Sequence, residues 1–244
     1  MTLTISVVIP VKDDARQLER CLAALRRQTR PADEIVVVDN GSNDDSAAVA
    51  RDAGAVVVFV AGGGIPAASA AGYDAARCAV IARLDADCEP AIDWLERIHT
   101  GLDRHPDAVA VTGGARFTDG PRPLRAPLAL LYLGAYFGTV GLALGHPPLF
   151  GSNFAMRRAA WLAVRSEVHR GDAFVHDDMD LSVHLGPRRR IRYLRGLGMG
   201  ISMRPMFDAR AFATRLRRGF HTLLIHWPHE LPWLRWWRGL VRRR

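Results

Sequence analysis

The sequence predicts an α/β protein whose core is a doubly wound, mostly parallel sheet. Short apolar runs of strand length alternate with segments of helical periodicity over residues 5–112. Turn-forming and capping residues separate these segments. Of the 244 residues, 49% are hydrophobic and 24% are charged, which is enough apolar material for one substantial core. Strands and helices that alternate in this way form parallel sheets covered by helices.

The order of the expected elements follows from the same patterns. Apolar runs place strands at Ile5–Val11, Ile35–Asp39, Val56–Val60, Val80–Asp85 and Val109–Thr112. Caps and periodicity place helices after Asp13 and Asp14, from Ser42 to near Gly54, over Ala67–Arg77 and over Ile92–Leu102. Doubly wound sheets bind ligands beyond the carboxyl ends of their strands, so functional residues are expected there.

Acidic side chains, rather than a phosphate-binding glycine motif, follow these strands. The first turn contains no GxGxxG or GK[ST] sequence. Asp39 ends the second strand, and Asp85 and Asp87 end the fourth. Residues two apart on an extended strand point the same way, so the last two carboxylates are expected to share one site. A divalent cation would neutralise them and hold a diphosphate; the alternative is a solvated turn in which Asp87 caps the next helix.

The C-terminal residues 188–244 are strongly basic. They contain 15 arginines against Asp208 and Glu230, so the net charge of +8 originates there and the rest of the chain is acidic overall. Four tryptophans accompany the arginines: Trp227, Trp233, Trp236 and Trp237. Tryptophan together with arginine favours an anionic membrane surface, rather than nucleic acid, as the partner of this tail.

The N-terminus and the cysteines indicate a cytoplasmic protein. The chain starts directly with a strand pattern and shows no secretory signal. Cys21, Cys78 and Cys88 form neither an even set nor a CxxC pair, which argues against disulfides and a structural zinc site.

Several segments resemble family 2 glycosyltransferases, an inverting group with the GT-A fold. Three segments resemble the nucleotide-sugar-binding half of this family in their order and spacing: Ser6–Val11, Val36–Asp44 and Leu84–Asp87. The resemblance continues to Gly151–Arg158 and to Asp177–Leu181, which is similar to the family's Glu-Asp-x-Asp-Leu element. It implies a GT-A-type fold with an acceptor-side extension. Three parts are expected: a nucleotide-sugar-binding half (residues 1–115), an acceptor-binding and catalytic-base half (116–205) and a basic, aromatic, helical tail (206–244).

The resemblance also implies a nucleoside pocket at the first two strands. Pro10 and Val11 would line it with backbone groups, and Asp39 would accept hydrogen bonds from the base. The alternative for Asp39 is an Asx turn that caps its own loop. Asp44 either serves the same pocket or stabilises a helix N-terminus, and we favour the helix.

Donor phosphates and a metal ion are implied at the fourth strand. Asp85 and Ala86 would contact the donor, and Asp85 and Asp87 would bind Mn²⁺ or Mg²⁺. At the position of the family's Ala-Arg-Asn-x-Gly element, this chain has Ser69 and Ala70 in place of the arginine and the asparagine. Contacts to the donor at this position are therefore in doubt. Arg83 would restore a positive charge beside Asp85, unless it extends out of the sheet.

The family's single-displacement mechanism requires a base near the acceptor hydroxyl. Asp178 aligns with that base, while Asp177 takes the usual Glu position and is able to exchange roles with it. The alternative is that these acids and Asp180 only stabilise the first turn of a helix that continues through Leu185. The Gln-x-x-Arg-Trp element of processive synthases is absent, so addition of a single sugar is expected.

Residues 126–145 contain no charged side chain. This length is sufficient to span a bilayer. A single crossing, however, would separate the nucleotide pocket from Asp178, and the tail has no second apolar run. We therefore expect a helix or helix pair at an anionic cytoplasmic membrane face, where a lipid-linked acceptor would be reached. The alternative is a buried hairpin with a solvated basic tail.

The remaining polar residues receive simpler interpretations. His221, His226 and His229 lack the spacing of a metal-binding motif and are interpreted as non-ligands. Arg215, Arg217 and Arg218 either close over a diphosphate or form a solvated helix face.

Two other functions share features with this chain. A sugar-1-phosphate nucleotidyltransferase would have a basic, glycine-rich first loop, whereas Asp13 and Asp14 make this loop acidic. A non-enzymatic membrane or nucleic-acid adaptor would explain the basic tail but not the acids at three separate element ends. The predicted function is transfer of a sugar from a nucleotide diphosphate donor to an acceptor hydroxyl.

Overall fold

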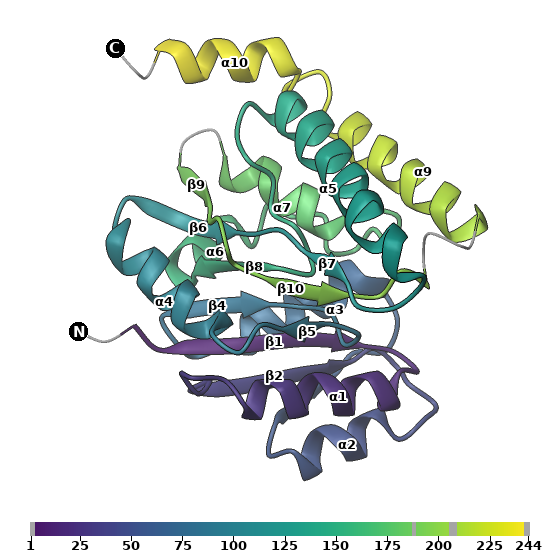
Figure 1. The fold of residues 1–244 in the computed structure, drawn as a ribbon. Coiled ribbons are helices and arrows are strands. Elements are labelled where there is room, and N and C mark those ends of the chain that lie inside the picture. The colour runs from purple at the N-terminus through teal and green to yellow at the C-terminus, as the bar shows by residue number, and fades with distance from the viewer. Residues whose placement is uncertain (1–2, 187–188, 205–208, 242–244) are drawn as a thin grey trace.

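The computed structural model describes residues 3–186, 189–204 and 209–241 (Figure 1). Its elements are β1 (Ile5–Val11), α1 (Ala15–Arg26), β2 (Glu34–Asp39), α2 (Ser46–Asp52), β3 (Val56–Phe59), α3 (Gly64–Ala75), β4 (Val80–Arg83), β5 (Glu89–Pro90), α4 (Trp94–Arg104), β6 (Ala108–Thr112), β7 (Arg116–Phe117), α5 (Arg122–Leu144), β8 (Phe154–Arg157), α6 (Arg158–Val164), α7 (Asp177–Leu185), β9 (Arg190–Tyr193), β10 (Met199–Ile201), α9 (Ala209–Ile225) and α10 (Pro232–Val241). The expected boundary at 205–206 and the last three arginines of the tail lie outside the described residues.

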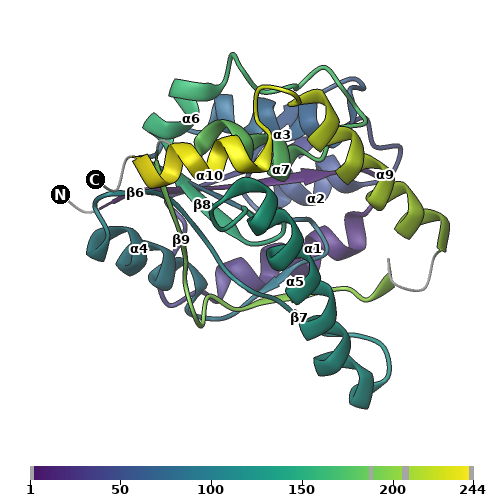
Figure 2. The same ribbon diagram turned by 90° about the horizontal axis from the view of Figure 1, so that it is seen from above.

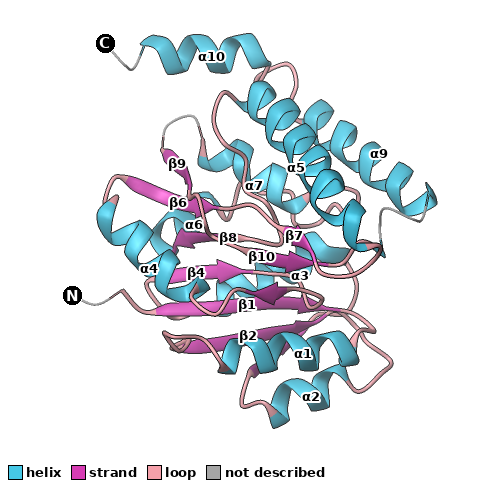
Figure 3. Ribbon diagram, in the orientation of Figure 1, coloured by secondary structure: helices cyan, strands magenta, loops and turns pink. Residues whose placement is uncertain are grey.

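Seven strands form the central sheet in the order β3-β2-β1-β4-β8-β6-β9 (Figure 3). β3, β2, β1 and β4 are parallel to one another, and β6 is parallel to β9. β8 is antiparallel to both of its neighbours, β4 and β6. The mostly parallel α/β sheet predicted from the sequence is thus confirmed. Three short strands form a second sheet in the order β5-β10-β7.

Alternation along β1 divides its apolar side chains between two helical layers. Ile5, Val7 and Ile9 belong to a buried cluster with side chains of α1 and α4, whereas Val8 packs with side chains of α3, α6 and α7. The two layers lie on opposite faces of the sheet (Figure 2). A Cβ atom at Gly72 would overlap Val8, so this glycine allows α3 to approach β1 closely.

The loop after β2 differs from the sequence expectation. The helix does not begin after Ser42 but at Ser46, and the Ser42 hydroxyl accepts a hydrogen bond from the Asp13 backbone N–H. The Asp44 carboxylate accepts hydrogen bonds from the backbone N–H groups of Ser46 and Ala15, at 3.0 and 2.9 Å. A hydrogen bond from the Ser46 hydroxyl and these two backbone bonds lower the pKa of Asp44. Asp44 therefore caps the N-termini of both α1 and α2, and its helix interpretation is supported.

α5 is one continuous, largely exposed helix of 23 residues that ends at Gly145 with φ 75°. Among the described residues it is the helix with the length and apolar composition of a membrane span, and 17% of its most apolar window is buried. Leu130, Leu131 and Leu142 are 76%, 67% and 66% exposed. The alternative of a buried hairpin at residues 126–145 is therefore wrong. α5, α9 and α10 lie outside the two helical layers of the sheet (Figures 1 and 2).

Candidate active site

Asp85 and Asp87 occupy a tight turn after β4. The strand ends at Arg83, two residues earlier than expected, and the Cys88 N–H donates to the Asp85 carbonyl at 3.1 Å. The extended backbone that the sequence predicted through these acids is therefore wrong. The turn nevertheless places both carboxylates at one cavity, so the expected pairing is present for a different geometric reason.

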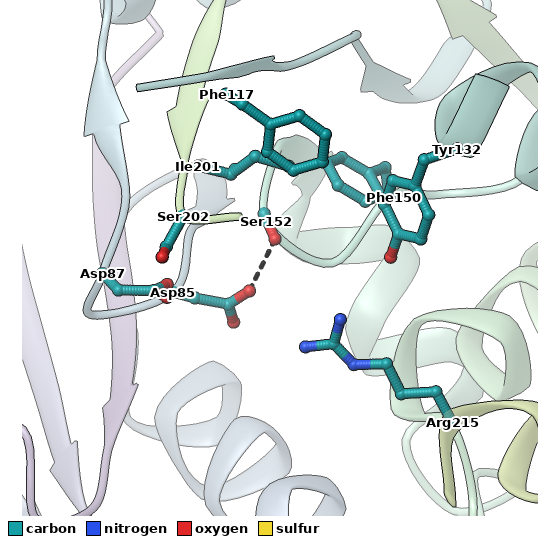
Figure 4. Close-up of a pocket in the computed structure, with 9 residues that line it drawn as sticks. All are labelled: Asp85, Asp87, Phe117, Tyr132, Phe150, Ser152, Ile201, Ser202 and Arg215. Atoms are coloured by element: carbon teal, nitrogen blue, oxygen red, sulfur yellow. Dashed lines mark hydrogen bonds between the residues drawn. The ribbon is translucent and has the colours of Figure 1, made fainter. Parts of the chain in front are cut away.

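A cavity that opens to solvent lies between this turn, the loop before β8 and the helices α5 and α9 (Figure 4). Its lining comprises Asp85, Asp87, Phe117, Tyr132, Phe150, Ser152, Ile201, Ser202 and Arg215. The Ser152 hydroxyl donates to Asp85 Oδ2 at 2.6 Å. The guanidinium of Arg215 extends from α9 into the space opposite the two acids (Figure 4). Arg215 thus faces the acidic site, as in the first of its two interpretations.

The electrostatics of this turn suit a hard divalent cation. Burial and the nearby Asp85 raise the pKa of Asp87, although Arg204, 3.3 Å away, opposes this shift. Carboxylate oxygens of Asp85 and Asp87 and the Cys88 sulfur lie within 4.8 Å of one another. Burial keeps the pKa of the Cys88 thiol well above its usual value, so the two carboxylates are the groups of this turn whose chemistry suits a hard cation. A cation there would relieve the repulsion that raises the pKa of Asp87.

Arg83 is buried and does not extend out of the sheet. Its guanidinium lies 3.0 Å from Asp85 Oδ1 and 3.5 Å from Asp177 Oδ2, and only 2% of the residue is exposed. It therefore links the turn after β4 to the start of α7. Ser69, which replaces the family's arginine, donates a hydrogen bond to Asp177 Oδ2 at 2.8 Å. The residue at this position thus contacts the first acid of α7.

The two acids that begin α7 have different environments. Burial and the neighbouring Asp178 raise the pKa of Asp177, with Arg83 opposing the shift. Burial would also raise the pKa of Asp178, but the imidazole of His176, 3.4 Å away, and the Gly151 N–H lower it. Asp178 is consequently a carboxylate at neutral pH, which is the form that a general base requires.

Two donor groups lie near the Oδ2 atom of Asp178. Its Oδ2 atom accepts from the Gly151 N–H at 2.8 Å and lies 3.3 Å from the Tyr136 hydroxyl. That hydroxyl has a single proton and is closer to the Leu149 carbonyl, at 2.6 Å. The Tyr136 hydroxyl therefore makes its stronger hydrogen bond to the Leu149 carbonyl, and the Gly151 N–H is the close donor to Oδ2 of Asp178.

The predicted nucleoside residues lie at the carboxyl ends of β1 and β2. Val11 pairs with Asp39 in the parallel register, and Pro10 pairs with Val38. Asp39 is buried, and its Oδ1 accepts the Ser42 N–H at 2.8 Å, which is the bond of the alternative Asx-turn interpretation. These residues share a sheet edge with Asp85 but do not line the cavity.

Some residues at this site were missed from the sequence. Ser152 had a signal, since it lies in the matched segment Gly151–Arg158, but no role was assigned to it. Tyr132 and Arg204 reach the site from α5 and from the segment after β10, and no motif marks either of them. Ala86 was assigned to the donor and lies, 6% exposed, between the two acids.

Comparisons with known proteins agree with this geometry. The family model described as Glycosyl transferase family 2 matches residues 6–163. Glycosyltransferase AglE of Haloferax volcanii is 38% identical over 101 residues, which cover 38% of this chain and 33% of that protein. The chain thus matches about one third of the length of this curated relative.

Solved structures share the fold. Mannosyltransferase PcManGT from Pyrobaculum calidifontis, in complex with GDP-Man and Mn²⁺, superposes with a TM-score of 0.66 at 20% identity, covering 91% of this chain and 62% of that one. Glucosyl-3-phosphoglycerate synthase from Mycobacterium tuberculosis, in complex with Mn²⁺ and UDP-Glc, superposes with a TM-score of 0.63 at 22% identity, covering 91% and 78%. The fold is that of the GT-A glycosyltransferases. On the family match, which covers more than half of its length, the chain belongs to glycosyl transferase family 2.

Proposed function

We propose that this protein transfers one sugar from a nucleotide diphosphate donor to an acceptor hydroxyl, with inversion and with a divalent cation. The observation that carries the proposal is the cavity in which Asp85 and Asp87 face Arg215. Two acids with a cation on one side and an arginine on the other are complementary to a diphosphate. The solved relatives bound to GDP-Man and UDP-Glc with Mn²⁺ support this donor class.

The donor would lie along the carboxyl edge of the sheet. Pro10, Val11 and Asp39 would hold the nucleoside, and Asp85 and Ala86 the adjoining ribose and phosphate. Mn²⁺ or Mg²⁺ held by Asp85 and Asp87 would stabilise the negative charge of the departing diphosphate. Arg204 forms an ion pair with Asp87 in the described structure, and this ion pair would break as the cation binds.

Asp178 would act as the base that removes the proton of the acceptor hydroxyl. The hydroxyl oxygen then attacks the anomeric carbon from the face opposite the diphosphate, which inverts that carbon. Arg83 would keep Asp177 and Asp85 at fixed positions on either side of the reaction.

Removal of the Asp87 carboxylate tests the donor site. Asp87→Ala should weaken Mn²⁺-dependent donor binding by more than about 100-fold, since even residues that only orient a metal ligand contribute 10–100-fold in metal affinity. Calorimetric titration of UDP-glucose and GDP-mannose, with and without Mn²⁺, measures this effect. Asp107→Ala, which removes a half-exposed acid paired with Arg190, is the matched control. Mn²⁺-dependent binding of equal strength in the Asp87 variant would refute the metal assignment.

Acidic pH should weaken the same interaction. Only the ionised carboxylate of Asp87 binds a cation, and its pKa lies above that of an ordinary aspartate. As the pH falls, protonation of Asp87 therefore begins at a higher pH than for an ordinary aspartate, and Mn²⁺-dependent donor affinity should decline with it. A titration series over pH checks this direction; donor affinity that stays constant down to the ordinary aspartate pKa would contradict it.

We also propose that α5, α9 and α10 dock on an anionic membrane at the cytoplasmic face, where a lipid-linked acceptor would be reached. Exposed apolar side chains on these helices include Leu130, Leu131, Leu142, Phe220, Trp233 and Trp237. The Trp236 indole donates to the Leu142 carbonyl at 2.7 Å and joins α10 to α5. Residues 188–244, with 15 arginines against two acids, carry a net charge of the complementary sign.

Liposome flotation tests this docking. The protein should float with anionic vesicles, and its binding should weaken as the salt concentration rises. Deletion of residues 227–244 should also reduce binding. Replacing Leu130, Leu131 and Leu142 by serine should reduce binding at least about 10-fold, because each buried leucine contributes roughly 1.5–3 kcal/mol. The control replaces Phe59 and Ile92 by serine. These residues are 67% and 63% exposed and lie outside α5, α9 and α10. Intact protein that stays in solution with anionic vesicles at low salt would exclude the docking.

A further inference from the structure

Three histidines and one aspartate converge outside the proposed donor site. Asp180 and His184 lie one turn apart on α7, His226 directly follows α9, and His169 lies in the loop after α6. One ligand atom from each lies within 4.8 Å of the others. The imidazole centroids are 5.0–5.8 Å apart. Side chains from three separate segments thus meet at one point.

A single oxygen of Asp180 is the focus of this cluster. Its Oδ1 lies 2.8 Å from His169 Nδ1, 3.0 Å from His226 Nε2 and 3.4 Å from His184 Nε2. The second oxygen, Oδ2, accepts the His169 backbone N–H at 2.8 Å, which fixes the orientation of the carboxylate. Asp180 is 3% exposed, whereas the His169 side chain is 39% exposed, so the carboxylate is buried and the cluster meets solvent at His169.

Hydrogen bonds within the cluster do not account for this arrangement. A carboxylate oxygen has two lone pairs, and the nitrogens of His169 and His226 already take both positions on Oδ1. Nε2 of His184 is buried without a hydrogen-bond partner. Buried polar nitrogens are rarely left unpaired, and this one lies 3.4 Å from Oδ1 of Asp180, within reach of the same point as the ligand atoms of the other two imidazoles.

We propose that His169, Asp180, His184 and His226 bind one zinc ion, separate from the cation of the donor site. Three imidazoles and one carboxylate form a four-ligand set that suits tetrahedral Zn²⁺. Bonds of about 2.0–2.2 Å place tetrahedral ligand atoms about 3.4 Å apart. The separations of the three nitrogens from Oδ1 of Asp180 are 2.8, 3.0 and 3.4 Å, and all four ligand atoms lie within 4.8 Å of one another. The proposal replaces the interpretation of His226 as a non-ligand and keeps that interpretation for His221 and His229.

The surroundings support the same assignment. The outward nitrogen of His184, Nδ1, lies 3.4 Å from the Glu167 carboxylate. A carboxylate on the second nitrogen is the usual device that fixes the tautomer of a zinc-bound imidazole. Each imidazole remains neutral on binding, with its proton on the nitrogen that faces away from the metal.

The ion would fasten the C-terminal end of α9 to α7. α7 carries Asp177 and Asp178, and α9 carries Arg215. Zinc would therefore hold the helix of Arg215 in a fixed position against the helix of the base. Its role is structural, because four protein ligands fill the tetrahedron and leave no position for substrate.

Cobalt substitution of the full-length protein tests this site directly. After dialysis against chelator, one equivalent of Co²⁺ should give the visible d–d absorption of a tetrahedral nitrogen-rich site, and one equivalent of Zn²⁺ should remove it. Zn²⁺ at about 100 times its Kd should also raise the Tm by about 5–10 °C. His184→Ala and His226→Ala should each lose both responses. Glu167→Gln should weaken the affinity about 10-fold.

Two control variants show whether the metal responses come from this cluster. His221→Ala removes a histidine of α9 that bonds Asp172 outside the cluster, and it should retain both responses. Asp87→Ala should also retain them, because the donor-site cation is a different one. Wild-type protein without a tetrahedral Co²⁺ spectrum would overturn the proposal, whatever the folding of the variants. So would a spectrum that persists in His184→Ala or disappears in Asp87→Ala.

Discussion

Asp178→Asn is expected to reduce turnover about 10²–10⁴-fold, the contribution typical of a positioned general base. The amide retains the shape of the side chain and can still accept the Gly151 N–H, but it cannot take the proton of an acceptor hydroxyl. Donor affinity should remain nearly unchanged, because Asp178 does not line the cavity of Asp85 and Asp87. Single-turnover kinetics with saturating donor, together with donor titration, separate the chemical step from binding.

Asp177→Asn is the necessary companion variant. Ser69 and Arg83 contact the Asp177 carboxylate. Asp177→Asn should therefore lose less activity than Asp178→Asn, mainly because the start of α7 is positioned less well. Inactivity of Asp177→Asn combined with near-normal turnover of Asp178→Asn would transfer the base to Asp177. Equal and small losses in both variants would show that neither acid removes the proton.

Five of the seven strands of the sheet, β1, β2, β3, β4 and β6, were predictable because they are short apolar runs, whereas β9, with the sequence Arg-Ile-Arg-Tyr, carries no such run. Ile5–Val11 was predicted with the bounds that the structure shows. The reversed strand β8 was not predicted as a strand, since Phe154–Arg157 has no alternation that distinguishes it from a short helix. The helix after Ser42 began four residues late because Asp44 binds two backbone N–H groups, a tertiary contact that a local cap rule does not include.

The candidate site shows a similar division. The carboxylates at 39, 85, 87, 177 and 178 were found from motifs, because those motifs are local. Arg83 was placed on the correct strand, but its burial between two acids depends on α7, which lies about 90 residues later in the chain. Arg215 remained undecided for the same reason. Family membership now sets aside the nucleotidyltransferase and the non-enzymatic adaptor.

The histidine cluster was not recognisable from sequence spacing. Zinc motifs are identified by ligands that are close in sequence, such as an i, i+4 pair on one helix. Here Asp180 and His184 form such a pair, but the other two ligands are at 169 and 226. His226 was compared with its sequence neighbours at 221 and 229, neither of which belongs to the cluster.

Arg83→Met is expected to destabilise the fold by about 3–5 kcal/mol, the usual cost of removing one partner of a buried ion pair. The change leaves Asp85 and Asp177 without their shared cation, and Asp177 is largely buried. Urea unfolding measures the loss, which corresponds to a decrease in Tm of roughly 6–20 °C for a chain of this size. Arg83→Lys should recover part of the stability, since one ammonium carries the charge but does not reach both acids in a bidentate manner.

The pH dependence of this loss distinguishes an ion pair from simple packing. Arg83 opposes the rise in the pKa of Asp177, so its removal should raise that pKa further. Protonation of Asp177 removes the unpaired buried charge, and the destabilisation of Arg83→Met relative to wild type should therefore shrink as the pH is lowered from about 7 to about 5. Arg190→Met, which removes an arginine whose side chain is 71% exposed in its pair with Asp107, should cost no more than about 1 kcal/mol. The loss of stability in Arg83→Met is compared with the loss in the Arg190→Met control. If the two losses are equal, or if the Arg83→Met loss does not change with pH, the guanidinium acts only through packing and its charge does not hold Asp85 and Asp177.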